Sequence, residues 1–158
     1  MAFDTAWRLL GHAADTEDVV QDALLDAFRL HVRQPVNNWG GVLRHLVTRR
    51  AIDHLRKYRR IVAMSPEAYE PAAPQSEQPE SVAIERELAE RLRGAIADLT
   101  DREASVFSLH YFGEMPNGDI AETLGISKDA VAVALHKARK RLKELLGLQE
   151  ADARRAKP

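Results

Sequence analysis

Apolar residues recur every three or four positions along most of the chain, and this spacing predicts amphipathic helices. The pattern is interrupted by Gly11, by Pro35 with the asparagine pair that follows it, and by Gly113 with Pro116. The helices expected between these interruptions span residues 2–10, 16–29, 39–60, 82–98, 101–112 and 117–146, the last stretch containing a turn. We therefore predict an all-α fold made of two small helical domains joined by a flexible linker.

The predicted helix at residues 16–29 has an apolar and a polar side, and Asp15 is placed to cap its start. The apolar positions are expected to form a buried stripe of Val19, Val20, Ala23, Leu24, Ala27 and Phe28. On the polar side, Glu17 and Asp18 are explained by their favourable interaction with the helix dipole. Gln21 and Asp22 lie beyond the first turn, so the dipole does not account for them.

A loop expected over residues 32–38 leads into a basic helix. The apolar side of that helix comprises Val42, Leu43, Leu46, Val47, Ile52 and Leu55. Its charge comes from Arg44, Arg49, Arg50, Arg56, Lys57, Arg59 and Arg60. A basic helix beside a loop that ends in Trp39 can hold a nucleic-acid backbone and stack a base. Packing of Trp39 in the core is the alternative, and the sequence leaves both open.

Residues 61–81 differ in composition from the rest of the chain, with many Pro, Glu, Ser, Gln and Ala residues. Four of the seven prolines lie between Pro66 and Pro79, which predicts a flexible linker. A coil of about 19 residues averages roughly 25 Å end to end and reaches about 65 Å when stretched. The two domains can therefore touch sites two helical turns of DNA apart only when a larger scaffold stretches the linker.

Residues 82–112 predict two further helices. The first has an apolar side that includes Val82, Ile84, Leu88, Leu92, Ala95, Ile96 and Leu99. The second begins at Thr100, which forms a capping box with Glu103. Gly113 and Pro116 end it.

Residues 117–146 predict a helix, a tight turn and a second helix. Ala121 is small enough to let the helices approach, Gly125 permits the turn, and Ser127 caps the second helix. The inward positions of that helix are Val131, Leu135, Ala138, Leu142 and Leu145. This is the pattern of a helix-turn-helix, which lays its second helix in the DNA major groove. An ordinary helical hairpin would fit any one of these features, but their combination favours the helix-turn-helix.

Composition fits a soluble globular protein: of 158 residues, 45% are apolar and 30% charged, and no apolar run is long enough to span a membrane. The absence of cysteine excludes disulfides and thiolate metal sites and suits the cytoplasm. The net charge of −1 is unevenly distributed, because residues 1–60 and 127–158 are basic while residues 61–126 are acidic. A protein that coats nucleic acid indiscriminately would be basic throughout.

Enzymatic chemistry has little support in the sequence. The six histidines are scattered and none sits in a metal-binding motif. His45 and His54 are nine residues apart, which places them on opposite sides of a helix. We therefore expect no catalytic residue, no metal, no cofactor and no enzyme; a metal-dependent nuclease, the alternative, would cleave plain DNA in a chelator-sensitive manner.

With both halves in view, the chain resembles the extracytoplasmic-function sigma factors of bacterial RNA polymerase over almost its whole length. The resemblance rests on RLLGHAADTEDVVQDALLDAFR, then LRHLVTRRAIDHLRKYRR, and finally LTDREASVFSLHYFGEMPNGDIAETLGIS followed by LHKARKRLKELL. It implies that residues 1–60 are sigma region two and that residues 82–148 are region four. Residues 61–81, the linker between them, would run through the polymerase toward its active site, where their carboxylates could mimic nucleic acid. Residues 149–158 are expected to be a disordered tail.

The resemblance also implies roles for individual residues. Asp18, Gln21 and Asp22 would bind the clamp helices of the β′ subunit, and region four would sit on the β flap. The minus-ten promoter element would be recognised and opened by Arg33, Asn37, Asn38, Trp39, Arg49, Arg56, Lys57, Arg59 and Arg60. The minus-thirty-five element would be bound by Ser127, Lys128, Ala132, Val133, His136, Lys137 and Lys140. An anti-sigma factor is a further expected partner, without membrane insertion of this chain.

Three departures from the family pattern affect these expectations. The chain begins close to RLLG, so about one helix of the usual N-terminus is expected to be missing. Val42 and Arg49 stand where the family commonly has Trp and Asn, which puts base choice at the minus-ten element in doubt. Ala132 and Ala134 replace residues that are often basic or polar, so we expect Ala132 and Val133 to contact thymine methyl groups.

Two alternatives remain at this point. Val133 could instead pack on a neighbouring subunit or an anti-sigma factor. The whole chain could be a stand-alone helix-turn-helix regulator that binds an operator as a dimer, although this gives no role to Asp18, Gln21 and Asp22. Co-sedimentation with core polymerase separates a sigma factor from such a regulator.

Overall fold

The structure, a computed structural model, describes residues 1–68 and 79–148. Within them the chain forms helices and no strand, which confirms the all-α prediction. The helices are α1 (Ala2–Leu10), α2 (Ala13–Arg33), α3 (Trp39–Met64), α4 (Glu80–Ala97), α5 (Asp101–Tyr111), α6 (Asn117–Leu124) and α7 (Lys128–Leu145). A 3₁₀ turn over Pro66–Ala68 follows α3.

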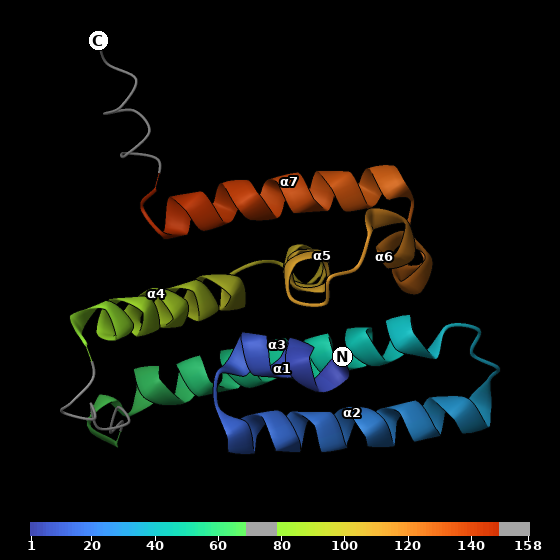
Figure 1. The fold of residues 1–158 in the computed structure, drawn as a ribbon, viewed down its shortest axis with the longest axis horizontal. Helices are drawn as coiled ribbons and strands as arrows, with labels where there is room; N and C mark the ends of the chain where they lie inside the picture. The colour runs from blue at the N-terminus through green and yellow to red at the C-terminus, as the bar shows by residue number, and fades with distance from the viewer. Residues whose placement is uncertain (69–78, 149–158) are drawn as a thin grey trace, which may run out of the picture.

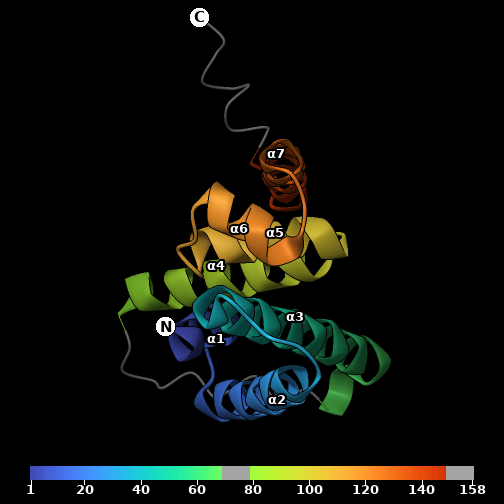
Figure 2. The same ribbon diagram turned by 90° about the vertical axis from the view of Figure 1, so that its right-hand side faces the viewer.

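The helix α3 is the centre of the arrangement. It packs against α1 and α2 on one side and against α4, α5 and α6 on the other. Figures 1 and 2 show α1 to α3 as one group and α5 to α7 as another, with α4 lying along α3 at their junction. The two predicted helical units are therefore in direct contact in this structure.

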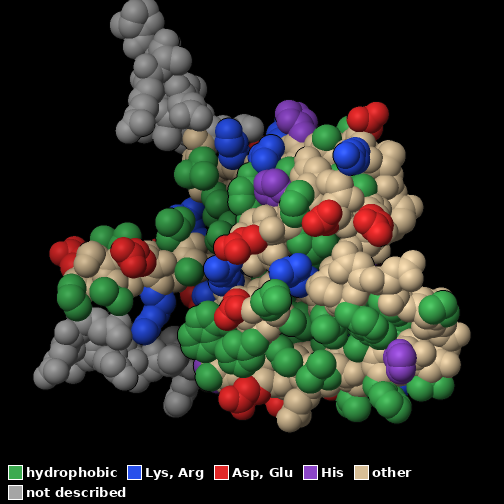
Figure 3. Space-filling view, turned by 45° about the vertical axis from the view of Figure 1, so that its right-hand side comes forward, with side chains coloured by type: hydrophobic (Ala, Val, Ile, Leu, Met, Phe, Trp, Pro, Cys, Tyr) green, Lys and Arg blue, Asp and Glu red, His purple; other side chains and the backbone are tan. Residues whose placement is uncertain are grey.

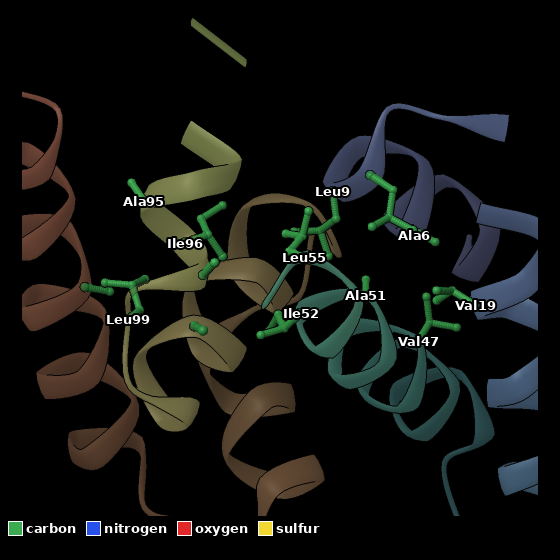
Figure 4. Packing of buried hydrophobic residues seen from close by; sticks show 14 of the residues in the cluster. Ala6, Leu9, Val19, Val47, Ala51, Ile52, Leu55, Ala95, Ile96 and Leu99 are labelled. Carbon is green, nitrogen blue, oxygen red and sulfur yellow. The ribbon is translucent and has the colours of Figure 1, made fainter. Parts of the chain in front are cut away.

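One hydrophobic core runs across the contact between the two units. Figure 4 shows Val47, Ala51, Ile52 and Leu55 of α3 between helices from both halves of the chain. On one side they meet Ala6, Leu9 and Val19, and on the other Ala95, Ile96 and Leu99, all in the same cluster. The cluster also includes Ala138 and Leu142 of α7. Burial of this shared apolar surface stabilises the contact between the units.

A second, smaller core holds the helix-turn-helix together. It consists of Val106, Leu109, Met115, Ile120, Ala121, Val131, Ala134 and Leu135. Ile120 and Val131 are fully buried, and Ala121 lies between α6 and α7 as its small size predicts. Leu145 is the exception among the predicted inward positions of α7, because 38% of its surface is exposed.

Several helix boundaries differ from the prediction. The helix α2 begins at Ala13, so Asp15 lies in its first turn rather than at its cap, and it continues to Arg33. It ends there because Gln34 precedes a proline and adopts an extended conformation. The helix α3 continues to Met64, into the stretch predicted as linker, and α4 already begins at Glu80. The rest of that linker and the predicted tail fall outside the described residues, 69–78 and 149–158 being left out.

The prediction was also wrong about which apolar residues are buried. Leu24 and Phe28 of α2 are 53% and 67% exposed, whereas Val19, Ala23 and Ala27 are buried. In α4 the first three predicted apolar positions, Val82, Ile84 and Leu88, are exposed as well. The reason is geometric: α2 and the first half of α4 lie at the edge of the bundle, and each has a neighbour on one side only.

The described part of the chain contains no helix that is both long enough and apolar enough to cross a membrane.

Candidate nucleic-acid interface

The turn between α6 and α7 has the geometry that the sequence predicts. Gly125 ends α6 in the left-handed conformation with φ of 65°, which glycine adopts without steric cost. The hydroxyl of Ser127 accepts a hydrogen bond of 3.0 Å from the Ala130 N–H at the start of α7. These two residues fix the point where α7 begins and the direction in which it leaves the turn.

The outward face of α7 carries the residues predicted to contact the minus-thirty-five element. All of them are exposed: Ser127, Lys128, Ala132, Val133, His136, Lys137 and Lys140. In the space-filling view of Figure 3, blue and purple side chains gather in the upper part of the molecule, where α7 lies in Figure 1. Ala134, by contrast, is buried in the smaller core and cannot reach DNA, so its departure from the family pattern concerns packing.

Arg139 on α7 is held in place by α5. Its Nε donates a hydrogen bond of 2.7 Å to the Tyr111 hydroxyl, and its guanidinium lies 5.5 Å from the centre of the Tyr111 ring. A planar cation fixed in this way has lost part of its rotational freedom before it meets a phosphate.

The outer face of α2 combines polar and apolar groups. Asp18, Gln21 and Asp22 are exposed, as expected for a surface that binds another protein. Leu25, Phe28 and Val32 are also exposed and follow Gln21 along the helix at intervals of three or four residues, so they share its face. Figure 3 shows hydrophobic side chains gathered in the lower part of the molecule, where α2 lies in Figure 1.

The sequence analysis left out Leu25 and Val32 and placed Phe28 in the buried stripe, although a signal for a second apolar face was present. The apolar positions of α2 cover too wide an arc for one buried stripe, because Leu25, Phe28 and Val32 form a second set at helical spacing. Two such stripes on a single helix indicate that one of them faces a partner.

The connection between α2 and α3 holds the next group of predicted residues. Arg33 is the last residue of α2 and Trp39 the first of α3, so only the residues between them form a loop. Asn38 caps α3, because its Oδ1 accepts a hydrogen bond of 3.1 Å from the Gly41 N–H. Trp39 is half-buried, with its ring 5.7 Å from that of His31, so part of it stays accessible for stacking on a base.

The basic residues of α3 divide into two groups. Arg49, Lys57 and Arg60 are exposed. Arg56 and Arg59 point to α4 and α5, where they contact carbonyl and carboxylate oxygens, although 48% of the Arg59 side chain stays exposed. Within the predicted minus-ten surface, these contacts cover Arg56 for the most part and Arg59 in part.

A cleft of about 370 Å³ runs between α3 and the C-terminal half, with His45, Arg49, Arg56 and Asp101 among its lining residues. Burial lowers the pKa of His45, and the nearby positive charge of Arg49 lowers it further. His45 is therefore held neutral in this cleft at a pH where an exposed histidine would begin to take up a proton. In the described residues, no group of three or more His, Asp or Glu side chains could hold a metal ion.

Comparison with known proteins finds a family model that matches the C-terminal part of the chain. The family model for sigma-70 region 4 matches residues 89–142, which include α5, the helix-turn-helix and most of α7.

Two curated relatives extend the likeness to almost the whole chain. The ECF RNA polymerase sigma factor SigW of Bacillus subtilis is 24% identical over 156 residues, which cover 91% of this chain and 82% of SigW. The ECF RNA polymerase sigma factor SigE of Mycolicibacterium smegmatis is also 24% identical, over 93% of this chain but only 58% of SigE.

A solved structure agrees with the fold. The sigma factor RpoE of Bartonella quintana, determined in complex with the anti-sigma factor NepR, matches with a TM-score of 0.53 and 20% identity. The match covers 92% of this chain and 89% of RpoE. In its helix-turn-helix and in its sequence over almost its whole length, the chain is similar to the extracytoplasmic-function sigma factors of bacterial RNA polymerase, and residues 89–142 match sigma-70 region 4.

Proposed function

We propose that this protein binds core RNA polymerase and directs transcription initiation at promoters that carry a minus-ten and a minus-thirty-five element. The observation that carries the proposal is the helix-turn-helix of α6 and α7, which lies inside the stretch that matches sigma-70 region 4 and presents an exposed basic face. The proposed activity is recognition rather than catalysis, and it takes place in the cytoplasm, where the polymerase works.

The minus-thirty-five element is assigned to the outer face of α7. Lys128, Lys137 and Lys140 are exposed and can neutralise phosphates, while Arg139 is held on Tyr111 for the same purpose. Base edges are left to Ala132, Val133 and His136, of which the first two can only offer apolar contacts. Because two of the three base-contacting residues offer only apolar contacts, we expect the minus-thirty-five element bound by this protein to contain thymine, whose methyl group accepts such contacts.

The surface for core polymerase is assigned to the outer face of α2. Asp18, Gln21 and Asp22 give it specificity, and the exposed Leu25 and Phe28 give it apolar area that water covers in the free protein. A protein interface needs both: an apolar centre that loses its water and a polar rim that selects the partner. The β′ clamp helices are the proposed partner here, and the β flap is the proposed partner of residues 82–148.

The minus-ten element is assigned to the connection between α2 and α3 together with the first and last turns of α3. Arg33, Asn37 and Trp39 border the loop, and Arg49 and Arg60 extend the basic surface along the helix. A half-exposed tryptophan at the start of a basic helix can stack on a base that has left the duplex.

Within this proposal, residues 1–60 are sigma region two, residues 61–81 are the linker and residues 82–148 are region four. An anti-sigma factor is the proposed regulator.

The test begins with binding to core polymerase. The Phe28→Ser variant should associate with purified core polymerase at least about tenfold more weakly than the wild type, because it removes exposed apolar area at the centre of the proposed interface. The matched control is Ile84→Ser, which changes an apolar residue on α4 that is 60% exposed, against 67% for Phe28. Wild-type protein that fails to co-sediment with core polymerase would overturn the proposal.

Run-off transcription on fragmented genomic DNA completes the test. The protein with core polymerase should yield discrete transcripts whose upstream sequences share two elements, and polymerase alone should not. A stand-alone regulator gives the opposite pattern, since it binds its operator without polymerase and does not sediment with it.

A further inference from the structure

The cleft beside His45 has hydrogen-bond donors that the rest of the molecule leaves unused. We call it the α3–α5 cleft, because its lining residues come from α3, from the first two turns of α5 and from Leu124 at the end of α6. Figures 1 and 2 show α5 and α6 on the same side of α3. The volume of the cleft, about 370 Å³, lies in the range of pockets that hold small molecules.

Two arginines on opposite walls of the cleft have free guanidinium groups. Arg49 of α3 and Arg102 of α5 are exposed, and neither side chain forms a hydrogen bond or an ion pair with the described residues. The hydroxyl of Ser105, which follows Arg102 at a spacing of three on α5, also has no partner among them. Guanidinium and hydroxyl groups are donors that proteins use for phosphate oxygens. The cleft therefore presents unpaired donors from two helices.

His45 adds an unpaired nitrogen to the same cleft. Its imidazole is among the lining groups, and its Nδ1 is buried without a hydrogen-bond partner in the described part of the chain. Leaving a buried polar atom unpaired costs free energy, so few such atoms occur in folded proteins. An unpaired nitrogen at the wall of a cleft indicates that the cleft is complete only with a ligand.

The carboxylates of the cleft oppose an anion only weakly. Asp101 is already paired with Arg56, which also donates to the Leu99 carbonyl at 2.8 Å and so holds α5 against α3. Asp53 is the other carboxylate of the lining, and Arg50 on the same helix lies close enough to interact with its charge. Since the lining contains three arginines and two aspartates, the cleft is positively charged.

Part of the lining is apolar. Ile52 of α3, seen in Figure 4, belongs to the larger core, and Leu124 packs against the smaller one. Both also border the cleft. Inorganic phosphate would leave this apolar surface in contact with water, whereas the sugar or the base of a nucleotide would cover it. The cleft thus combines a place for phosphate with a place for a less polar group.

We propose that the α3–α5 cleft is a binding site for a free nucleotide. Arg49, Arg102 and Ser105 hold its phosphate groups, to which each guanidinium can donate two parallel hydrogen bonds. Its sugar or base lies against Ile52 and Leu124. The site requires only the fold of the free protein, so it does not depend on the function proposed above.

Binding measurements on the full chain test the site directly. Adenosine diphosphate and guanosine diphosphate are the probes, each titrated by calorimetry at physiological salt. At least one should bind saturably at one site per chain, and Arg102→Gln should bind it at least about tenfold more weakly, because a charge-assisted hydrogen bond is lost. The matched control is Arg86→Gln, which removes the same charge from the exposed first half of α4 and should bind as the wild type does.

Two results of these titrations would overturn the proposal. One is the absence of saturable binding for both nucleotides, or an equal loss of affinity in Arg102→Gln and Arg86→Gln. The other concerns nucleic acid as the alternative source of phosphate. If Arg102→Gln weakens binding of a single-stranded oligonucleotide as much as binding of the nucleotides, the cleft holds a nucleic-acid backbone instead.

The pKa of His45 reports whether the nucleotide occupies the cleft. In the free protein, burial and the positive charge of Arg49 lower this pKa. A phosphate group beside Arg49 supplies negative charge, so the pKa of His45 should rise when the nucleotide binds. Nuclear magnetic resonance of the imidazole protons follows this titration. The signals of His136, on the exposed face of α7, should stay unchanged when the nucleotide is added; a response of His136 in place of His45 would refute binding in the cleft.

Discussion

The Nε atom of Arg93 on α4 donates a hydrogen bond of 2.9 Å to the carbonyl oxygen of Leu9, 84 residues earlier in the chain. The guanidinium lies directly over Gly11, which ends α1 with φ of 66°, and any side chain at that position would overlap it. The last turn of α1 is thereby attached to the C-terminal half of α4. The contact between the two halves is thus fixed by polar groups as well as by the apolar core.

The shared core predicts a large effect of one substitution in α4. Ile96→Ala should lower the free energy of unfolding by about 2–5 kcal/mol, because Ile96 is fully buried between α3 and the C-terminal helices. Ile84→Ala in the same helix should change it by no more than about 0.5 kcal/mol, since that side chain is exposed. Urea denaturation followed by circular dichroism measures both. Equal losses in the two variants would contradict the packing described for α4.

A buried hydroxyl predicts a stabilising substitution. Thr48 of α3 is fully buried, and its Oγ1 has no hydrogen-bond partner among the described residues. Thr48→Val removes this unpaired group and should raise the free energy of unfolding by about 1 kcal/mol. Thr16 of α2 is equally buried, but its hydroxyl donates to the His12 carbonyl at 2.8 Å.

The same substitution at the paired position serves as the control. Thr16→Val should therefore destabilise the protein by about 1 kcal/mol. Thermal melts of the two variants give the comparison. A loss at both positions would mean that the Thr48 hydroxyl has a partner after all.

The buried His45 predicts a loss of stability in mild acid. Burial and Arg49 lower its pKa in the folded protein below the value of 6.5 that it has in an unfolded chain. The unfolded state therefore takes up the proton first as the pH falls, and stability decreases from about pH 6.5 downward until the folded protein also protonates. The His45→Gln variant, which cannot take up this proton, should lose less stability between pH 7 and pH 5 in denaturation measurements.

His136→Gln is the matched control for this measurement, because His136 is exposed on α7. It should follow the wild-type pH dependence. A His45→Gln variant that declines as steeply as the wild type would show that other groups account for the acid sensitivity.

The outer face of α7 predicts a dependence on thymine methyl groups. A minus-thirty-five probe in which uracil replaces the contacted thymine should bind about 0.8 kcal/mol more weakly, or roughly fourfold in Kd. The loss should shrink in Val133→Ser, which removes the apolar contact from the protein side. Equal affinity for all single thymine-to-uracil probes would assign Val133 to a protein contact instead.

The sequence predicted the features of this fold that depend on neighbouring residues. Gly125 in the left-handed conformation, the Ser127 cap and the capping box of Thr100 with Glu103 each follow from short-range geometry, and the structure contains all three. The exposed positions of α7 were also predicted correctly. The apolar residues that recur along this helix identify its buried side, and the exposed side is the opposite one.

Features that depend on distant residues could not be predicted in this way. Periodicity shows that Leu24 and Phe28 belong to an amphipathic helix and that α2 carries more than one apolar stripe, but it does not show which stripe the rest of the molecule buries. Arg56 and Arg59 were assigned to DNA from the family resemblance and their charge, and only the positions of Asp98 and Asp101 in space reveal an internal partner.

The core that crosses from α1 and α3 to α4 and α7 also bears on the solubility of the protein. If the halves separate, Ile96 and Leu99 become exposed to solvent. They can then cause self-association until another macromolecule covers them. Contact between the halves keeps these side chains out of water and thereby opposes self-association.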